Sequence, residues 1–512
     1  MDLKNFFEFS VDRSQNRIAV VDSNQRLTYN ELNEKVDRVA ASLQKLGLGK
    51  QDRVMVLLKN RVETVVLFWA VQKLGAIFTP INFRLSQEDI MYCIQDVEPK
   101  FVVFEDASEH LIMKETFKER PIFISIKKNN PLADISFIEL EEHSLTSFDR
   151  VIIQDQDISS IYYTSGTTGV PKGVPRSHKN EYASAMAHIV QCGYKRFDTT
   201  LGVFPLYHVI GLRSLQVITA LNGNFYTLSD FDSLESLQII DKEKVNCLFQ
   251  TPTMYHDIVS HPYAKEVDFS TLHTLVYSGA SMSKELINKC DELMKPERIV
   301  NQYGSTEIYT FTYSPDVRRK PGTAGKPGIH QNIKLVSTNY KKEASFYPRV
   351  VPNGDVGEVI VNMKSPEAFK GYWNRPDITK KCIYEGWYYT GDLGFIDDEG
   401  DLNIVGRIDD MIISGGEKIY PELIEKVLVE HPKVNEVIII GEEDERWGQI
   451  VVAYIVPNDC SISFQELDRF CKYHNQLSSY QRPRKYVLLD HIPKSPTGKV
   501  LRKKLKENII CP

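Results

Sequence analysis

The sequence predicts an α/β protein with a large N-terminal domain and a small α+β C-terminal domain. Three observations support this prediction: the length of the chain, an alternation of strand-like and helix-like segments, and a change of pattern near residue 320. The chain has 512 residues, and a single hydrophobic core does not grow to that size. At least two domains are therefore expected.

Two hydrophobic periods alternate over the first hundred residues. Residues 28–31 form a capping box, apolar residues spaced for one helical face follow, and Gly47 ends the helix. Further strands are predicted at 54–58, 76–79 and 101–104, and helices at 62–74 and 86–96. The alternation resumes after residue 158 and includes a strand at 275–278. It predicts packed parallel or mixed sheets covered by helices.

The pattern changes twice in the last third of the chain. Gly and Pro become frequent near residue 320, and short alternating strands such as 357–363 predict a small β-barrel-like unit. Beyond residue 407, helices are predicted at 421–430 and 464–474, and strands at 437–441, 450–456 and 485–489. About a hundred residues suffice for an independent domain. We therefore expect an N-terminal domain over residues 1–408 and a C-terminal domain over 409–512.

Composition excludes several classes of protein. The formal net charge of −6 gives no basic footprint for nucleic acid. No apolar run reaches the roughly 18 to 20 residues that span a bilayer, and the first residues lack the layout of a secretory signal. The eight cysteines show neither a CxxC pair nor a zinc spacing. We expect a cytoplasmic protein with free thiols.

The strongest motif is the string YTSGTTGVPKG at residues 163–173, which follows a predicted strand at 158–162. Its glycines allow backbone N–H groups to approach an anion, and four hydroxyls and one lysine add donors. This composition suits a polyphosphate, although a Gly/Ser/Thr loop can also be a plain surface turn. The string does not match the Walker pattern.

The string resembles the phosphate loop of the adenylate-forming superfamily, which includes acyl- and aryl-CoA synthetases, peptide-synthetase adenylation domains and luciferase. Four further strings match in the family's order, namely QYGSTE at 302–307, YTGD at 389–392, GRID at 406–409 and PKSPTGK at 493–499. The resemblance covers roughly residues 27–505. It implies an acid–CoA ligase that uses ATP, Mg²⁺ and coenzyme A, with a mobile C-terminal domain.

The resemblance also implies roles for individual residues. Lys499 would meet the carboxylate and phosphate during adenylation, Glu307 and Thr164 would hold Mg²⁺, and Asp392 would bind the ribose hydroxyls. By residue type alone, Glu307 could be a solvated carboxylate, Asp392 a turn residue and Lys499 part of a basic tail. The catalytic set is Lys499, His208, Glu307 and Thr306. The ATP- and AMP-binding set is Thr164, Ser165, Gly166, Thr167, Thr168, Gly169, Lys172, Tyr303, Gly304, Thr306, Asp392 and Arg407.

A finer resemblance is to the 4-chlorobenzoate–CoA ligase branch. It rests on RIDDMIISGGE at 407–417, ERWGQ at 445–449 and YQRP at 480–483. The branch turns its C-terminal domain between two half-reactions, and Asp409 matches its hinge. Arginine forks and aromatic faces suit a phosphorylated adenosine. The implied CoA-binding residues are Arg84, Gly415, Gly416, Trp447, Tyr480, Arg482 and Arg484.

By the same resemblance, a mostly apolar set of residues would form the acyl pocket. His208 matches an aromatic gate, although a lone histidine in an apolar run can also be a core residue. Val209 and Ile210 provide no counter-ion for an amino group, which disfavours an amino acid. Tyr309 and Thr310 depart from the chlorobenzoate pattern, which argues against that exact acid. The mostly apolar set suits a ring or a modest alkyl chain, so an aryl acid is the first expectation and a medium-chain acid the second. The implied pocket is His208, Val209, Phe249, Ala280, Gly304 and Tyr309.

Two rival functions remain open at this point. An acyl-adenylate ligase that loads a carrier protein would not need Trp447, Tyr480 or Arg482. A non-catalytic nucleotide-binding relic that senses acids would be expected to have lost Lys499 or Glu307. Neither the acid nor the oligomeric state, monomer or homodimer, follows from the sequence.

Overall fold

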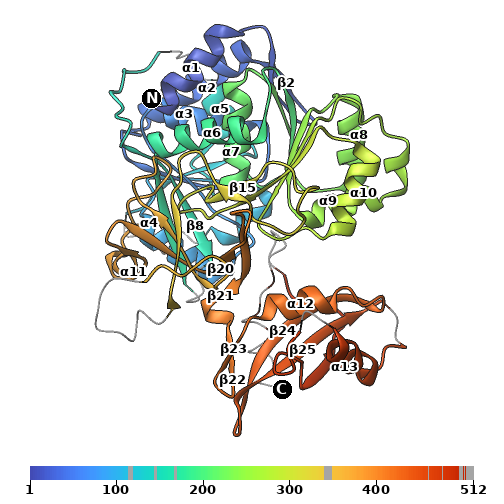
Figure 1. Ribbon diagram of the computed structural model, residues 1–512. Helices are drawn as coiled ribbons and strands as arrows, with labels where there is room; N and C mark the ends of the chain where they lie inside the picture. Colours follow the sequence, from blue (N-terminus) through green and yellow to red (C-terminus); the bar gives the residue numbers. More distant parts are fainter. Residues whose placement is uncertain are drawn as a thin grey trace. The chain divides into compact units, whose positions relative to one another are not determined.

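The computed structural model describes residues 1–112, 119–142, 147–165, 170–338, 349–458, 461–474, 477–494, 500, 502 and 505 (Figure 1). Its contacts divide the chain into two compact units. Unit 1 is Met1–Gly322, Pro327–Asn332 and Asn362–Trp387. Unit 2 is Thr323–Lys326, Ile333–Val361 and Tyr388–Pro512.

The first sheet of unit 1 has seven strands in the order β7-β6-β5-β3-β4-β8-β9. All neighbouring pairs are parallel except β8 with β9, which form an antiparallel hairpin. The strands are β3 (Arg53–Leu57), β4 (Ile77–Pro80), β5 (Phe101–Phe104), β6 (Ile122–Ser125), β7 (Ile135–Ser136), β8 (Ile158–Ser165) and β9 (Pro171–Ser177).

The second sheet runs β15-β14-β13-β12-β10-β11-β1-β2 within unit 1. The outer pairs β14–β15 and β1–β2 are antiparallel, and the inner pairs are parallel. The strands are β1 (Ile18–Val21), β2 (Arg26–Thr28), β10 (Thr199–Gly202), β11 (Asn224–Thr227), β12 (Cys247–Gln250), β13 (Thr274–Ser278), β14 (Arg298–Tyr303) and β15 (Thr312–Ser314).

Helices bury the faces of both sheets. Helix α3 (Val62–Lys73) is buried nearly all round, as expected of a helix that is apolar on every face. It lies in one hydrophobic core with α1 (Leu3–Arg13), α2 (Tyr29–Lys45), α6 (His178–Cys192) and α7 (Val209–Ala220). A separate core packs α8 (Ser233–Lys242), α9 (Pro252–Ser260) and α10 (Lys284–Met294) together (Figure 1). The remaining helices of unit 1 are α4 (Gln87–Val97), α5 (Phe137–Glu142) and α11 (Pro376–Cys382).

Unit 2 contains two small sheets. The first pairs β17 (Ile333–Val336) with β18 (Gly357–Asn362), continues to β20 (Trp387–Ile396), and adds β21 (Leu402–Arg407). The second has the order β23-β22-β25-β24, with β26 paired to β25. Its elements are β22 (Ile412–Ser414), β23 (Glu417–Ile419), α12 (Pro421–Leu428), β24 (Val434–Asp444), β25 (Gly448–Pro457), α13 (Phe464–Tyr473) and β26 (Lys485–Leu488).

The predicted fold class is confirmed, including the α/β sheets, the small β unit and the small C-terminal α+β part. The capping box at Thr28 and Glu31 is also confirmed. The strand predictions at 437–441 and 450–456 were too short, because β24 and β25 form one long hairpin whose exposed end is polar. Among the described helices, none is long and apolar enough to cross a membrane. Six cysteines are described, and all are free thiols: Cys93, Cys192, Cys247, Cys290, Cys382 and Cys471.

Candidate active site

The predicted phosphate loop joins the two strands of the β8–β9 hairpin. Thr164 and Lys172 are paired across this hairpin at the base of the loop. Both are half-buried, and the Lys172 ammonium lies 5.5 Å from the centre of the Tyr372 ring. The predicted residues Gly166, Thr167, Thr168 and Gly169 lie outside the described residues, as does the side chain of Ser165.

Glu307 is buried, with 8% of its surface exposed. The hydroxyl of Tyr372 donates a hydrogen bond of 2.6 Å to Glu307 Oε1. The alternative of a solvated surface carboxylate is therefore wrong for Glu307. Tyr372 was not predicted as a site residue, because it lies in none of the matched strings and carries only the weak signal of an aromatic beside Gly371.

A buried arginine links Glu307 to the hairpin. Arg176 on β9 is fully buried, and its Nη1 donates to the carbonyl oxygens of Glu307 at 2.8 Å and Glu367 at 2.6 Å. Its Nε lies 3.5 Å from Glu181 Oε1, which is also buried. Arg176 was not predicted either, although it lies two residues after Val174 and therefore on the same face of β9, where both side chains are buried. The strand that carries Lys172 is thus fixed to the segment that carries Glu307.

The string at 302–307 leaves strand β14 at a tight turn. Tyr303 ends the strand, and its ring meets Phe311 edge-on at 5.2 Å. A Cβ at Gly304 would overlap the carbonyl oxygen of Tyr309, so glycine allows the backbone segments to approach. Thr306 is half-buried beside Glu307. The turn therefore gathers Tyr303, Gly304 and Thr306 within a few residues of the buried carboxylate.

His208 caps helix α7, and its Nδ1 accepts from the backbone N–H of Ile210 at 3.3 Å. Burial, with a smaller effect from the positive charge of Arg213, lowers the pKa of His208 to about 4. The imidazole is therefore neutral near pH 7. A neutral ring suits a gate beside an apolar pocket, and it provides no permanent positive charge.

Of the other residues predicted for the acyl pocket, three are buried and Ala280 is exposed. Val209, Phe249 and Tyr309 are buried, and the rings of Phe249 and Tyr309 both contact the guanidinium of Arg213, each at 5.1 Å. The Tyr309 hydroxyl donates to Glu181 Oε1 at 2.7 Å. Ala280 is exposed, at the end of the bend that follows β13. The structure thus brings Phe249 and Tyr309 together and leaves Ala280 at the surface.

In unit 2, Asp392 and Arg407 are paired residues of strands β20 and β21. The Arg407 guanidinium donates to the Asp392 carboxylate and also to the carbonyl oxygen of Thr390. Asp392 lies within a strand and not in a turn, so its alternative as a turn residue is wrong. Two residues that were predicted to contact the nucleotide therefore form one charged pair.

The predicted hinge and most of the predicted CoA residues also lie in unit 2. Asp409 is exposed in the 3₁₀ turn Ile408–Asp410. Gly415 and Gly416 have positive φ angles of 58° and 87°, and a Cβ on Gly415 would press on the Trp447 ring. The Arg484 guanidinium lies over that ring, at 4.4 Å from its centre.

Three predicted CoA residues stand apart from this cluster. Tyr480 is exposed, and Arg482 Nε pairs with Asp468 Oδ1 at 3.2 Å. Arg84 belongs to unit 1, where it pairs with Asp230 at 3.0 Å. The predicted catalytic residue Lys499 lies outside the described residues.

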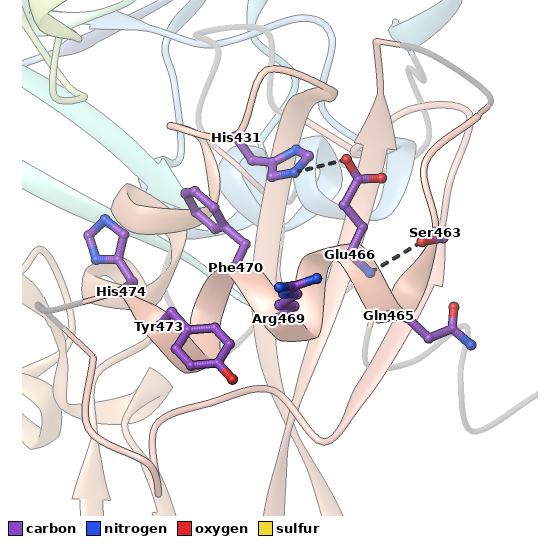
Figure 2. A pocket seen from close by; sticks show the side chains of 8 residues that line it. All are labelled: His431, Ser463, Gln465, Glu466, Arg469, Phe470, Tyr473 and His474. Carbon is purple, nitrogen blue, oxygen red and sulfur yellow. Dashed lines mark hydrogen bonds and ion pairs between the residues drawn. The ribbon is translucent and has the colours of Figure 1, made fainter.

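A surface hollow of about 640 Å³ lies on the C-terminal part of unit 2 and contains none of the predicted site residues. It is lined by one face of α13 together with His431 (Figure 2). Its Glu466 and His474 are paired, His474 with Glu430 at 3.3 Å. His431 lies 3.6 Å from Glu466, and Lys433 lies 3.0 Å from the same carboxylate. These pairs hold α13 against the end of α12.

The donor set near Glu307 fits a magnesium ion that is held mainly by phosphate and water. Among the described residues, no group of three His, Cys, Asp or Glu side chains could hold a metal alone. Mg²⁺ commonly takes one or two carboxylates and completes its octahedron with waters and substrate phosphates. One buried carboxylate, bonded to Tyr372 whose ring also contacts Lys172, meets that requirement. Glu307, with Thr164, would hold the ion and keep the nucleotide's phosphates partly neutralised.

The fold, a large α/β part followed by a small α+β part, is typical of a class of nucleotide-binding enzymes. Comparison with known proteins agrees. Residues 7–373 match the family of AMP-binding enzymes, and residues 423–499 match the C-terminal domain of AMP-binding enzymes. The chain belongs to this family.

Several relatives are similar over nearly their whole length. A long-chain-fatty-acid–CoA ligase of Mycobacterium tuberculosis is 32% identical over 94% of this chain and 93% of its own. A 4-chlorobenzoate–CoA ligase of Arthrobacter is 27% identical over 98% and 94%. The structure of the o-succinylbenzoate CoA synthetase of Bacillus subtilis with its acyl-adenylate superposes with a TM-score of 0.84, at 28% identity and 98% coverage of both chains. The protein is accordingly an AMP-forming acyl- or aryl-CoA ligase, and its cosubstrates and cofactor are ATP, CoA and Mg²⁺.

Proposed function

We propose that this ligase activates an aryl acid by adenylation and transfers the acyl group to free coenzyme A, with residues 409–512 turning about Asp409 between the steps. In the first step a carboxylate oxygen attacks the α-phosphorus of ATP, and the bond to the pyrophosphate oxygen breaks. In the second step the CoA thiolate attacks the acyl carbon and AMP leaves. The mixed anhydride is needed because a free carboxylate would have to expel an oxide.

One observation carries the assignment of the first step. The buried Glu307 carboxylate accepts from Tyr372, while its own backbone is bound by Arg176 of the strand that follows the phosphate-type loop. This arrangement holds a carboxylate, Thr164 and Lys172 on one rigid scaffold. Positioning and electrostatic stabilisation supply most of the catalysis in phosphoryl and nucleotidyl transfer. Lys499 would add a permanent positive charge where negative charge develops.

The buried side chains support an aryl acid as the first choice of substrate. Val209, Phe249 and Tyr309 present aliphatic and aromatic surfaces, and a flat ring packs well between aromatic side chains. A medium-chain acid is the second choice, because the same surfaces would also accept an alkyl chain.

Free CoA is favoured over a carrier protein by the cluster around Trp447. Its ring lies against Gly415 and under the guanidinium groups of Arg484 and Arg446, the latter at 4.9 Å from the ring centre. Guanidinium groups and an aromatic face suit the phosphorylated adenosine of CoA. A pantetheine arm on a carrier protein has no such adenosine.

A pyrophosphate-release screen over aryl and fatty acids, with ATP and Mg²⁺, tests the proposal. We expect the largest kcat/KM for an aryl acid, and acyl-CoA formation when free CoA is added. Uniform inactivity over a broad panel would contradict the adenylation step. Adenylation without any transfer to free CoA would favour the carrier-protein alternative.

A further inference from the structure

Arg213 is a buried cation among residues that the proposed function places in the acyl pocket. It lies on helix α7, four residues after Val209 and therefore on the same helical face. Only 3% of its surface is exposed. Its guanidinium lies 5.1 Å from the ring centres of both Phe249 and Tyr309.

The hydrogen bonds of Arg213 are all to neutral groups. Its Nη1 donates to Thr310 Oγ1 at 3.2 Å and its Nη2 to Gln302 Oε1 at 3.0 Å. Its Nε is buried and has no hydrogen-bond partner among the described residues. Across the same part of the chain, no carboxylate lies within 4.0 Å of the guanidinium.

The buried carboxylates of this region are bound by other groups. Glu181 accepts from Tyr309 at 2.7 Å and from Gln216 at 3.0 Å, and it lies 3.5 Å from Arg176. Glu367 accepts from Gln331 at 3.1 Å and contacts His330 at the same distance. Among the described residues, Arg213 thus has no directly bonded acid.

Burial of a guanidinium that has no directly bonded acid is unfavourable. Burial lowers the pKa of Arg213, and the more distant acidic groups, Glu367 and Glu181 among them, oppose this only in part. Arginine does not relieve this by losing its proton, since its pKa stays high even when burial lowers it. An anion that arrives with a ligand would supply the missing partner. Its planar fork binds a carboxylate through two parallel hydrogen bonds.

We propose that Arg213 pairs with a second carboxylate of the acid substrate, so that this ligase prefers a dicarboxylic acid to a monocarboxylic acid of the same skeleton. The inference rests on the proposed function, because it takes Val209, Phe249 and Tyr309 as walls of the acyl pocket. The first carboxylate reacts with ATP, and the second remains at the Arg213 end. A monocarboxylic acid leaves the cation unpaired and is therefore disfavoured.

Matched acids and two variants test the pairing. Benzoate is compared with benzene-1,4-dicarboxylate, and hexanoate with hexanedioate, by pyrophosphate release. For at least one pair, the wild type should favour the dicarboxylate by about 100-fold in kcat/KM. Arg213→Met, which keeps the apolar stem, should remove that preference, and Arg213→Lys should retain part of it.

A binding measurement without ATP separates this inference from the adenylation proposal. The preferred dicarboxylate should raise the unfolding temperature of the wild type and not that of Arg213→Met. Without ligand, Arg213→Met should unfold at the wild-type temperature or above, because an unpaired buried charge is removed. Ligand-dependent stabilisation without pyrophosphate release would support the pairing and contradict adenylation.

Two outcomes would overturn the inference. One is an equal loss of kcat/KM for both acids of each pair in Arg213→Met, with a lower unfolding temperature, which marks a structural residue. The other is a wild-type preference for monocarboxylic acids that the variant leaves unchanged, in which case adenylation stands without the pairing.

Discussion

Asp392 and Arg407 face each other across strands β20 and β21, and the guanidinium of Arg407 donates to the carboxylate of Asp392. The antiparallel register places two residues that are 15 positions apart side by side. The carboxylate is thereby held in one orientation. One carboxylate can accept from two adjacent hydroxyls, as a ribose requires.

Asp392→Asn should weaken ATP binding. The neutral amide loses charge-assisted hydrogen bonds, so KM for ATP should rise by roughly 10-fold or more, or about 1.5 kcal/mol. Pyrophosphate exchange at varied ATP measures this. Asp398→Asn, at an exposed position on the β20–β21 turn, is the control and should behave as wild type. An unchanged KM for ATP in Asp392→Asn would remove Asp392 from the nucleotide site.

Tyr372→Phe should weaken the response to magnesium. Without the hydroxyl, the buried carboxylate of Glu307 loses its 2.6 Å donor and is oriented less firmly. A hydrogen bond that orients a metal-binding carboxylate commonly raises the metal affinity by about 10-fold or more. Half-maximal adenylation by the variant should therefore require about 10-fold more Mg²⁺. Titration of pyrophosphate release with Mg²⁺ measures it. In the control Tyr384→Phe, the lost hydroxyl is one that donates to Glu385 at 3.3 Å and not to Glu307, and the Mg²⁺ titration of this variant should not shift.

Lys499→Ala should lower the adenylation rate by roughly 10² or more, about 3 kcal/mol, as for the loss of an oxyanion donor. Thioester formation from preformed acyl-adenylate should be retained. Lys494→Ala is the matched control, because Lys494 lies in the same string and pairs with Glu436. Wild-type pyrophosphate exchange in Lys499→Ala would defeat the catalytic role.

Asp409→Pro should spare adenylation and block thioester formation. Asp409 lies in a single 3₁₀ turn, and proline fixes φ at a position where the proposed rotation must change it. The two half-reactions are measured separately, by pyrophosphate exchange and by CoA transfer from supplied acyl-adenylate. Asp409→Ala leaves φ free and should carry out both. Equal slowing of both half-reactions in Asp409→Pro would argue against the hinge.

Glu422 should make the stability of unit 2 depend on pH. Burial, against the opposing charge of Arg502 and with repulsion from Glu425 and Asp410, raises the pKa of Glu422 to about 7. Its carboxylate lies against Gly406, at the end of β21. The folded state therefore binds the Glu422 proton more tightly than the unfolded state does. The resulting stability is fully present below the unfolded-state pKa of about 4.5 and is lost as the pH rises through about 7.

Glu422→Gln should therefore be more stable than the wild type at about pH 8, and the difference should shrink towards pH 5. The side chain is 32% exposed, so screening limits the effect to about 1 to 2 kcal/mol. Thermal unfolding of both proteins between pH 5 and pH 8 measures it. Parallel pH profiles for the two proteins would exclude titration of Glu422 as the cause.

The sequence by itself determined the fold class and the class of chemistry. The hydrophobic periods are local, so they predicted α2, α3 and the buried strands from neighbouring residues alone. The matched strings are local too, and they predicted Glu307, Asp392 and Lys172 as site residues. Their order and spacing were enough because each string is a short continuous segment of the chain.

Only the tertiary structure decided which side chains support these strings. Tyr372 lies 65 positions from the carboxylate it binds, and Arg176 lies 131 positions from the Glu307 carbonyl. The residues that surround Arg213 come from segments near residues 249, 302 and 310, and none of them bonds it through an acid. No local pattern connects these segments. Hydrophobic period and motif are properties of short segments, whereas the burial and pairing of a charge depend on every segment that packs around it.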